Sequence, residues 1–370
     1  MKLFSSSLLV LFILTVSGFS QTSFGPERQA KVFFEKNDKN RDGRVGATEF
    51  PYHVKGLFKI IDKNKDGAIT LAEDVAYRKS RLKRGGRSGD GVAAGGTRVL
   101  RDLVYARVGE RNLPLDLYLP AKSSKPLPVL MWIHGGGWRS GKKGNAGPAK
   151  PLVERGFAVV DVEYRLSGEA IFPAQVQDCK AAVRWVRANA KKYDLDPDRI
   201  AVWGSSAGGH LVAFLGTSGG VKEFETDANE GFSSRVNLVV DWFGPTDLLQ
   251  MNDQAVKGAR MDHNAPDSPE SLLVGGPLQK EPFRSVAVKA NPITYVSSDD
   301  PEFLIVHGDN DLLVSHKQSL MLNEALKKAG VKTTLQIVKN GGHGFKKGVK
   351  NSKELAEEAF DFLVQRFKKK

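Results

Sequence analysis

A serine flanked by small residues stands at the centre of the segment GSSAGG, residues 204–209. The segment directly follows the apolar run IAVW and directly precedes the helix-like run HLVAFLG. A serine held on a tight turn between a strand and a helix needs glycine two positions to either side, because a Cβ atom there would clash. Gly204 and Gly208 meet that need, which predicts Ser206, and not Ser205, as a nucleophile for acyl transfer.

A run of glycines, HGGGW over residues 134–138, follows a second apolar run. Consecutive glycines let backbone N–H groups approach a ligand atom without obstruction by side chains. Acyl transfer requires such donors around the tetrahedral oxyanion, from a loop of this kind and from the residue after the nucleophile. We therefore expect an oxyanion hole formed by Gly136, Gly137 and Ala207, with the ring of Trp138 as a wall of the acyl pocket.

A serine nucleophile needs a base at neutral pH, and the base needs an acid that fixes its tautomer. The order expected along the chain is serine, acid, histidine. Asp311 lies in HGDNDLLVSH just after one apolar run, and His343 lies in NGGHGF just after the last one. Both would follow the carboxyl end of a strand, where doubly wound sheets place their chemistry. Asp309 and Asp247 remain alternatives for the acid.

The other histidines receive structural interpretations. We expect His134 to brace the glycine loop, His210 to pack or hydrogen-bond locally, and His307 to end a buried strand. Three more histidines are expected at the surface: His53, His263 and His316.

The elements that position these residues begin near Thr97, where short apolar runs alternate with longer segments of helical periodicity. This alternation is typical of the α/β class with a mostly parallel, doubly wound sheet and helices on both faces. Helical spacing is clearest from Ala174 to Lys192. The first two runs lack a helix between them and should form an antiparallel hairpin. The predicted strands are residues 99–108, 114–119, 129–134, 157–164, 200–204, 238–244, 303–308 and 333–339.

Two segments near the N-terminus repeat one spacing of oxygen-bearing side chains. Oxygens at alternate positions can wrap one cation, a glycine at the sixth position allows a sharp turn, and the last glutamate can bind through two oxygens. This pattern predicts a small all-α EF-hand pair over residues 24–77, binding calcium with dissociation constants of about 10⁻⁴–10⁻³ M because lysines and arginines interrupt the loops. With the backbone carbonyls of Arg44 and Ala68, the predicted ligands are Asp38, Asn40, Asp42, Glu49, Asp62, Asn64, Asp66 and Glu73.

The motifs HGGGW, GSSAGG, HGDND and GGHGF, in this order and spacing, resemble the esterase and lipase branch of the α/β hydrolases. More narrowly, the chain is similar to bacterial acetyl-xylan and feruloyl esterases over Leu103–Phe367. The resemblance implies the α/β-hydrolase fold, a triad of Ser206, Asp311 and His343, and no organic cofactor. It also implies a carboxylesterase-type serine hydrolase, acting through an acyl-enzyme on short-chain or carbohydrate-linked esters of small molecules or polysaccharides.

Two other functions remain open. One is a serine peptidase of related fold, although no propeller-like repeat precedes the catalytic region to gate peptides. The other is a calcium-dependent binding protein in which the hydrolase domain is vestigial.

The first residues carry the pattern of an export signal, predicted over residues 1–20. Lys2 precedes an apolar run from Leu8 to Leu14, and small residues follow near a possible cut. The apolar run is shorter than the roughly 20 residues that span a bilayer, so no membrane span is expected after cleavage. The pattern predicts a secreted or periplasmic protein. Its single cysteine, Cys179, can form no intrachain disulfide and is expected to pack in a helix.

The formal net charge of +13 does not by itself indicate a nucleic-acid partner. Positive residues are spread along the chain and gather only at Arg78–Arg87 and at Lys368–Lys370, without the interleaved aromatic residues that stack on bases. We expect no nucleic-acid partner. The segment 78–96 is basic and rich in glycine, which predicts a flexible linker before a catalytic domain over residues 97–370.

Overall fold

The computed structural model describes residues 26–49, 58, 61–85, 91–92, 96–259 and 261–368. The predicted signal peptide, residues 1–20, lies outside the described residues, as do His53 and parts of the predicted linker. The chain divides into two compact units, with the main boundary between Tyr77 and Arg78.

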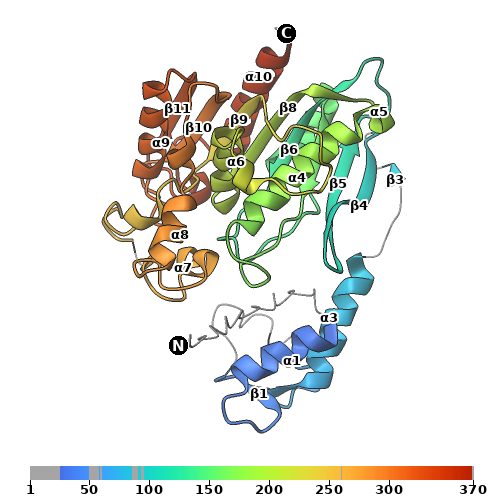
Figure 1. Ribbon diagram of the computed structural model, residues 1–370, viewed down its shortest axis with the longest axis vertical. Helices are drawn as coiled ribbons and strands as arrows, with labels where there is room; N and C mark the ends of the chain where they lie inside the picture. The colour runs from blue at the N-terminus through green and yellow to red at the C-terminus, as the bar shows by residue number, and fades with distance from the viewer. Residues whose placement is uncertain are drawn as a thin grey trace, which may run out of the picture. The chain divides into compact units, whose positions relative to one another are not determined.

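The larger unit is built on a sheet that has nine strands within the described residues (Figure 1). Six neighbouring strands, β7, β6 and β8 to β11, pair in parallel, whereas β5 pairs with β7 and β3 pairs with β4 in antiparallel fashion. In their order across the sheet the strands are β11 (Thr333–Val338), β10 (Glu302–Gly308), β9 (Leu238–Trp242), β8 (Leu195–Ser205), β6 (Leu127–Ile133), β7 (Ala158–Val162), β5 (Arg111–Leu119), β4 (Arg98–Val108) and β3 (Gly91–Val92).

All eight predicted strands are present, and β3 is an additional one. Strands β4 and β5 are neighbours joined at residues 109–110, as expected for the first two runs. The α-helices of this unit are α4 (Ala174–Ala188), α5 (Ala190–Tyr193), α6 (Ala207–Thr217), α7 (Pro269–Val274), α8 (Phe283–Lys289), α9 (Lys317–Lys328) and α10 (Ser352–Lys368). Its 3-10 helices are η2 (Gly147–Arg155), η3 (Lys222–Phe224), η4 (Leu248–Gln250), η5 (Pro292–Tyr295) and η6 (His343–Phe345).

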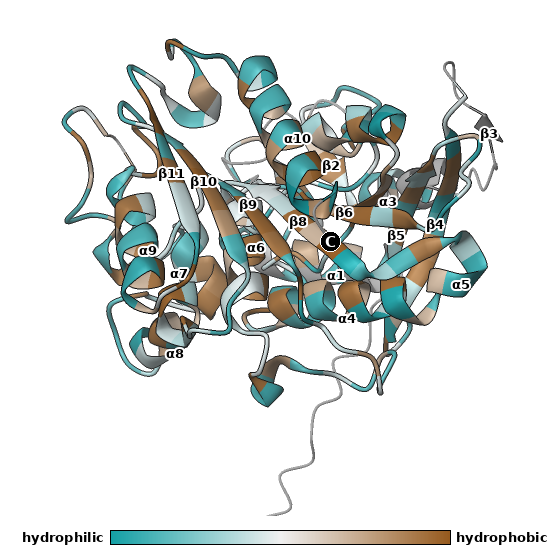
Figure 2. Ribbon diagram, turned by 90° about the horizontal axis from the view of Figure 1, so that it is seen from above, coloured by the Kyte–Doolittle hydropathy of each residue, from teal (hydrophilic) through white to brown (hydrophobic). Residues whose placement is uncertain are grey.

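The sheet is covered on both faces, which explains why its central strands are almost continuously apolar. Every residue of β7 and of β9 is buried, as expected for parallel strands between two layers of helices. One hydrophobic cluster joins the sheet to α4, α6 and α9, and a second joins it to η2 and α10. Figure 2 shows hydrophobic residues along the strands and hydrophilic ones on the outer sides of the helices.

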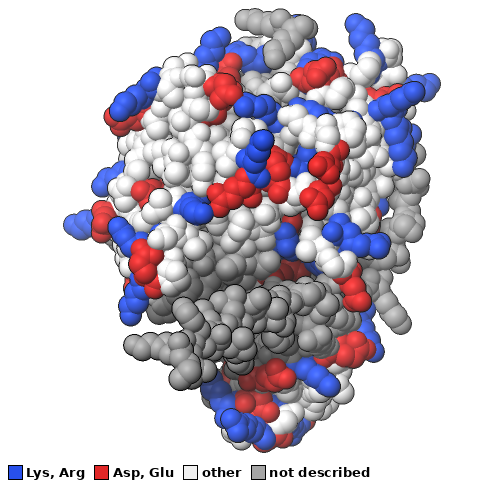
Figure 3. Space-filling view, viewed as in Figure 1, with Lys and Arg blue, Asp and Glu red and all other residues white. Residues whose placement is uncertain are grey.

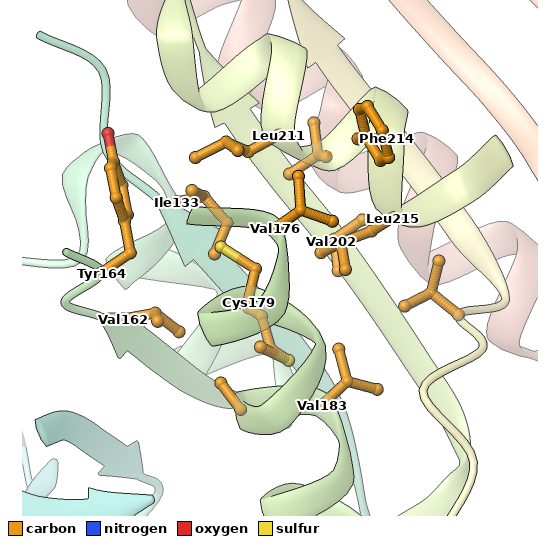
Figure 4. Packing of buried hydrophobic residues seen from close by; sticks show 14 of the residues in the cluster. Ile133, Val162, Tyr164, Val176, Cys179, Val183, Val202, Leu211, Phe214 and Leu215 are labelled. Atoms are coloured by element: carbon orange, nitrogen blue, oxygen red, sulfur yellow. The ribbon is translucent and has the colours of Figure 1, made fainter. Parts of the chain in front are cut away.

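The first cluster contains the single cysteine. Cys179 is fully buried, and Figure 4 shows its side chain among Ile133, Val162 and Val176. Burial raises the pKa of this thiol well above its ordinary value, so it stays protonated. Cys179 therefore acts as a small packing residue of α4, as the helical pattern indicated.

Three tryptophans pack edge to face in the second cluster. The ring centroids of Trp132 and Trp203 are 5.8 Å apart, and those of Trp203 and Trp242 are 4.8 Å apart. These rings come from the neighbouring strands β6, β8 and β9, so they form a row across the sheet, and the middle one, Trp203, packs against Phe360 of α10. All five tryptophans of the chain lie between residues 132 and 242.

The strand order locates the site. Strand β7 lies on one side of β6, and the chain then crosses to place β8 on the other side. Ligands in open α/β sheets bind at the carboxyl ends of the strands where the order reverses in this way. The glycine run follows β6 and the serine turn follows β8, so both predicted motifs lie at this switch point.

The smaller unit contains α1 (Pro26–Asn37) and the part of α3 (Leu71–Gly85) that ends at Tyr77. Two short strands lie between these helices in the chain, β1 (Arg44–Gly46) and β2 (Ala68–Thr70). The strands pair antiparallel through Val45 and Ile69, which lie in a small apolar cluster with Phe34 and Ile61. Helix α3 continues to Gly85, so the first eight residues of the predicted linker are helical. Lysine, arginine and leucine favour helix, and that propensity outweighs the linker-like charge of this segment.

Charges of both signs are mixed on the surface of the larger unit in Figure 3. Many are paired, as in the two-pronged contact of Arg366 with Glu302 at 2.8–3.0 Å. Among residues that the structure describes, no helix combines the length and the apolar character needed to cross a membrane.

Candidate active site

Ser206 lies on the turn between β8 and α6, with φ 55° and ψ −123°. A residue with a side chain rarely adopts this conformation, and the Ser206 N–H is held by the carbonyl of Trp242 at 2.9 Å. A Cβ atom on Gly204 would lie 2.2 Å from the carbonyl oxygen of Gly208, and one on Gly208 would lie 2.1 Å from that of Ile133. The close approach of α6 to the sheet therefore requires both glycines.

The glycine loop after β6 lies against this turn. A Cβ atom on Gly135 would be 3.3 Å from the Cβ atom of Ser206. Gly136 and Gly137 have φ values of 114° and 58°, which favour glycine. Ala207 opens α6, so its N–H is one of those for which a helix has no internal acceptor. The three predicted oxyanion donors therefore belong to segments that meet at Ser206.

His134 holds the base of the glycine loop. Its Nδ1 lies 2.8 Å from the carbonyl oxygen of Gly135, and its ring stacks on Tyr164 with centroids 4.4 Å apart. The Tyr164 hydroxyl donates to the His134 carbonyl at 3.0 Å. Burial lowers the pKa of His134, so this ring is a neutral brace.

Asp311 and His343 are brought together at the carboxyl end of the sheet. His343 Nδ1 lies 2.7 Å from Asp311 Oδ2, and the Asp311 side chain is fully buried whereas that of His343 is 26% exposed. The other oxygen, Asp311 Oδ1, accepts the N–H groups of Leu313 at 2.8 Å and Val314 at 3.0 Å. Because a carboxylate can only accept, the Nδ1 of His343 carries the proton and its Nε2 is free to act as a base.

The charge of Asp311 is stabilised by two histidines. Burial would raise the pKa of Asp311, but hydrogen bonds from His307 and His343 outweigh burial and hold that pKa well below its usual range. His307 Nε2 lies 3.4 Å from Asp311 Oδ2 and 2.8 Å from the carbonyl of Val314. The alternative acid Asp247 instead accepts from Leu249 N–H and caps η4.

Ser206 and His343 both lie against the end of β9. The Ser206 N–H bonds to Trp242, and the ring of the next residue, Phe243, packs on the His343 imidazole with centroids 4.7 Å apart. Among the described residues, no hydrogen bond joins Ser206 Oγ to His343. Contacts between a nucleophile and its base are often long before substrate binds, so this geometry is compatible with a triad.

The structure corrects two expectations. Trp138 is 1% exposed and its Nε1 donates to His210 Nδ1 at 3.2 Å, so its ring belongs to the core and offers no wall to an acyl pocket. His263 is buried and not at the surface, with its Nδ1 3.0 Å from Glu270 Oε1. His316 is half-buried. The contacts of Trp138 and His263 come from residues distant in the chain, so no local pattern reveals them.

His210 is buried in α6, but its hydrogen-bond partners are distant in the chain and not local as expected. Its Nε2 lies 2.7 Å from the carbonyl of Ala290, while Nδ1 accepts from Trp138. Burial lowers the pKa of His210 to about 4, so it is neutral at physiological pH. His210 therefore connects α6 to neighbouring segments and is not a second base.

The two predicted calcium loops share one pattern of internal hydrogen bonds. Glu49 Oε1 accepts the N–H of Lys39 at 3.0 Å, and Glu73 Oε1 accepts that of Lys63 at 3.2 Å. The glycines at the sixth positions have φ values of 80° and 85°, as the sharp turn requires. Asp62 Oδ1 is buried and has no hydrogen-bond partner.

The donor set of these loops suits a hard cation, because its side-chain ligands are carboxylate and amide oxygens. In the described part of the chain, however, no three His, Cys, Asp or Glu side chains are gathered closely enough to hold a metal ion. Arg44 of the first loop also pairs with Asp66 of the second. A cation would have to draw the carboxylates inward and compete with this arginine.

Residues 115–326 match the model of the BD-FAE family. The chain belongs to the BD-FAE family. The expected α/β-hydrolase fold is confirmed, and residues 54–73, which include the second loop, match the EF-hand family.

Relatives of this BD-FAE member are esterases. A truncated carbohydrate esterase from gut microbiota is 34% identical, with 74% of this chain and 98% of that chain covered and a TM-score of 0.63. A propionate-bound thermophilic esterase from Thermogutta terrifontis is 27% identical over 73% of this chain and 94% of that chain, with a TM-score of 0.58. Esterase LipC of Mycobacterium tuberculosis is 31% identical over 60% of this chain and 54% of LipC, so the chain spans about half the length of that relative.

Proposed function

We propose that this BD-FAE chain is a carboxylesterase-type serine hydrolase that works through an acyl-enzyme. The observation that carries the proposal is the 2.7 Å bond between His343 and buried Asp311, at the edge of the sheet where Ser206 stands on its strained turn. The esterase relatives support the same reaction class.

In the proposed mechanism, Asp311 holds the Nδ1 proton of His343, so that Nε2 accepts the proton of Ser206 Oγ as the serine attacks the ester carbonyl. His343 then passes this proton to the departing alcohol. Water, activated by the same nitrogen, attacks the acyl-enzyme and releases the acid. In total, one ester bond is broken and one water is consumed, which yields one alcohol and one carboxylic acid.

The negative charge that develops on the carbonyl oxygen would be met by the backbone N–H groups of Gly136, Gly137 and Ala207. Fixed donors of this kind are worth about 10²–10³ each in rate, because they require no reorganisation during the reaction. The conformation of the two glycines, with positive φ, allows their N–H groups to face a ligand without a side chain in the way.

We propose short-chain or carbohydrate-linked esters, of the acetyl or feruloyl type, as substrates. Support comes from relatives named as a carbohydrate esterase and as an acetyl ester-xyloside bifunctional hydrolase. Exposed apolar side chains near the site offer contact to such a substrate. Leu312 follows Asp311 and is 45% exposed, and Ile171, which contacts the end of α7 at Gly275, is 49% exposed.

The EF-hand unit is proposed to bind calcium without taking part in catalysis. The oxygen-rich loops and the unpartnered Asp62 carboxylate oxygen support calcium binding. Bound calcium would supply only a fixed positive charge that gathers the ligand oxygens within each loop. Residues 1–20 are proposed to be an export signal, which would place the protein in the periplasm or outside the cell, where calcium is abundant.

A fluorophosphonate probe, which reacts with activated serines, tests the reaction class. The wild-type chain should be labelled and should hydrolyse nitrophenyl acetate, whereas Ser206→Ala should lose both properties while its circular dichroism is unchanged. Ser205→Ala is the matched control and should retain labelling. Labelling of Ser206→Ala to the wild-type extent would exclude Ser206 as the nucleophile.

A further inference from the structure

A buried ion pair connects the segment before α7 to the turn that carries Asp311. The side chains of His263 and Glu270 are each 4% exposed. His263 Nδ1 lies 3.0 Å from Glu270 Oε1, and His263 Nε2 lies 3.0 Å from the carbonyl oxygen of Leu313. Both nitrogens of the ring therefore face an oxygen.

The protons of His263 follow from these contacts. A neutral imidazole has one N–H, so it could donate to Glu270 or to Leu313 but not to both. With Glu270 ionised, both oxygens that face the ring can only accept, so two N–H groups are needed to satisfy them. The imidazolium provides both, and the buried cation is compensated by the Glu270 carboxylate.

Leu313 transmits the contact to the proposed triad. Its carbonyl accepts from His263, and its N–H donates to Asp311 Oδ1 at 2.8 Å. The opposite oxygen of the same carboxylate holds His343 Nδ1 at 2.7 Å. His263 thus holds Leu313, whose N–H in turn holds the Asp311 carboxylate that orients His343.

Glu270 lies on the helix that contacts the glycine loop. It is the second residue of α7, and a Cβ atom on Gly137 would lie 3.1 Å from the Cβ atom of the first, Pro269. The ion pair therefore joins the helix beside the proposed oxyanion donors to the turn beside the proposed acid. The backbone of His263 is itself fixed, because its backbone N–H donates to Asn252 Oδ1 at 2.7 Å.

We propose that His263 and Glu270 are positioning residues: their buried ion pair holds the Asp311 turn in register with the glycine loop. The inference rests on the proposed esterase function for its kinetic consequence, but the ion pair can be tested without it. Neither residue would contact substrate. Loss of the pair should lower kcat, because misplacement of reacting groups by about 1 Å costs about 10²-fold in rate, and should change KM little.

The pair should also set an alkaline limit to activity. Burial lowers the pKa of His263, but the Glu270 carboxylate outweighs burial and the net pKa is raised above the ordinary value. The charged groups that face the ring are Glu270 from α7 and Asp262 from its own segment, with the Leu313 carbonyl from the Asp311 turn. The stabilisation is complete below the unfolded pKa of about 6.5 and is lost as pH rises through the folded pKa.

His263 must be charged to hold the turn, so activity should fall as pH rises through the His263 titration. This fall is the alkaline limb of the pH profile, and removing the carboxylate partner should move it.

The test is nuclear magnetic resonance of the histidine side chains in the full chain, combined with pH profiles of kcat for nitrophenyl acetate. The His263 signal, identified by its absence in His263→Gln, should titrate above pH 6.5, about the ordinary histidine value. In Glu270→Gln both this titration and the alkaline limb should move down by about 1–3 pH units, as expected when a neighbouring opposite charge is removed. His316→Gln is the matched control and should leave the limb in place.

A double variant, His263→Gln with Glu270→Gln, replaces the pair by two neutral side chains that can still form hydrogen bonds. It provides a test if a single variant, with one unpaired buried charge, fails to fold. Its alkaline limb should be absent. The Nδ1 proton of His343 gives a readout that needs no substrate: its low-field resonance should broaden as pH rises through the His263 titration. A His263 signal that titrates at or below pH 6.5, or a limb unmoved in Glu270→Gln, overturns the proposal. An inactive wild-type chain with the expected titrations would refute the esterase function alone.

Discussion

Asp311→Asn is the sharpest single test of the proposed triad, because the two side chains have the same shape. The carboxylate has two acceptor oxygens, and both are used. Oδ1 accepts the N–H groups of Leu313 and Val314 at 2.8 and 3.0 Å, and Oδ2 accepts from His343 Nδ1 at 2.7 Å. An asparagine has one carbonyl oxygen, so it can satisfy only one of these two sides.

The asparagine should turn its carbonyl oxygen toward the N–H groups of Leu313 and Val314. The opposite orientation would place the NH₂ group against these two donors and leave both without an acceptor. The asparagine NH₂ group then faces His343 Nδ1, which must become an acceptor. The proton of the imidazole moves to Nε2, the nitrogen that should receive the proton of Ser206. Catalysis then requires the disfavoured tautomer, and kcat should fall by about 10⁴-fold, which corresponds to about 5 kcal/mol of transition-state stabilisation.

The assay is steady-state hydrolysis of nitrophenyl acetate, with circular dichroism to confirm the fold. KM should change little because Asp311 is buried beneath the imidazole and does not face substrate. Asp309→Asn is the matched control two residues away and should remain near the wild-type rate. Wild-type kcat in Asp311→Asn, or an equal loss in Asp309→Asn, would refute the assignment of the acid.

Three further outcomes are expected. Gly208→Ala should fail to fold or melt at a much lower temperature, since its Cβ atom would lie 2.1 Å from the carbonyl oxygen of Ile133; an unchanged melting temperature would contradict the close approach of α6. Acetate esters should be hydrolysed faster than sixteen-carbon esters of the same alcohol, and the reverse order would refute the short-chain proposal. Chelation of calcium, or Glu49→Gln combined with Glu73→Gln, should loosen the EF-hand unit in hydrogen exchange while hydrolysis of a small ester is almost unchanged; a large loss of rate would show that the unit regulates catalysis.

The predicted parts of the fold are those encoded in short stretches of sequence. Strands such as β7 and β9 are recognisable because each is a continuous apolar run between two helical layers. The serine turn is recognisable because Gly204 and Gly208 stand at the positions where a side chain would clash. The linker is expected to begin at residue 78, whereas helix α3 continues to Gly85. The charge of residues 78–85 resembles a linker although their helix propensity is high.

The less predictable parts depend on contacts between distant residues. His263 bonds to Glu270 seven residues away and to Leu313 fifty residues away, so a polar local pattern gave no sign of its burial. Trp138 was misassigned for the same reason, because its partner His210 is 72 residues away. Asp311, Asp309 and Asp247 all follow the end of a strand, so this position does not rank them. The bond of Asp311 to His343 depends on the register of two parallel strands.

The row of tryptophans in β6, β8 and β9 has a practical consequence for spectroscopy. Every tryptophan of the chain lies between residues 132 and 242, so intrinsic tryptophan emission reports on the hydrolase unit alone. Trp242 also accepts the N–H of Ser206 through its backbone carbonyl, so the residue that carries one emitter is bonded to the reactive turn. Acylation of the serine should therefore be visible as a change in emission, whereas melting of the EF-hand unit should be invisible to it and appear only in far-ultraviolet dichroism.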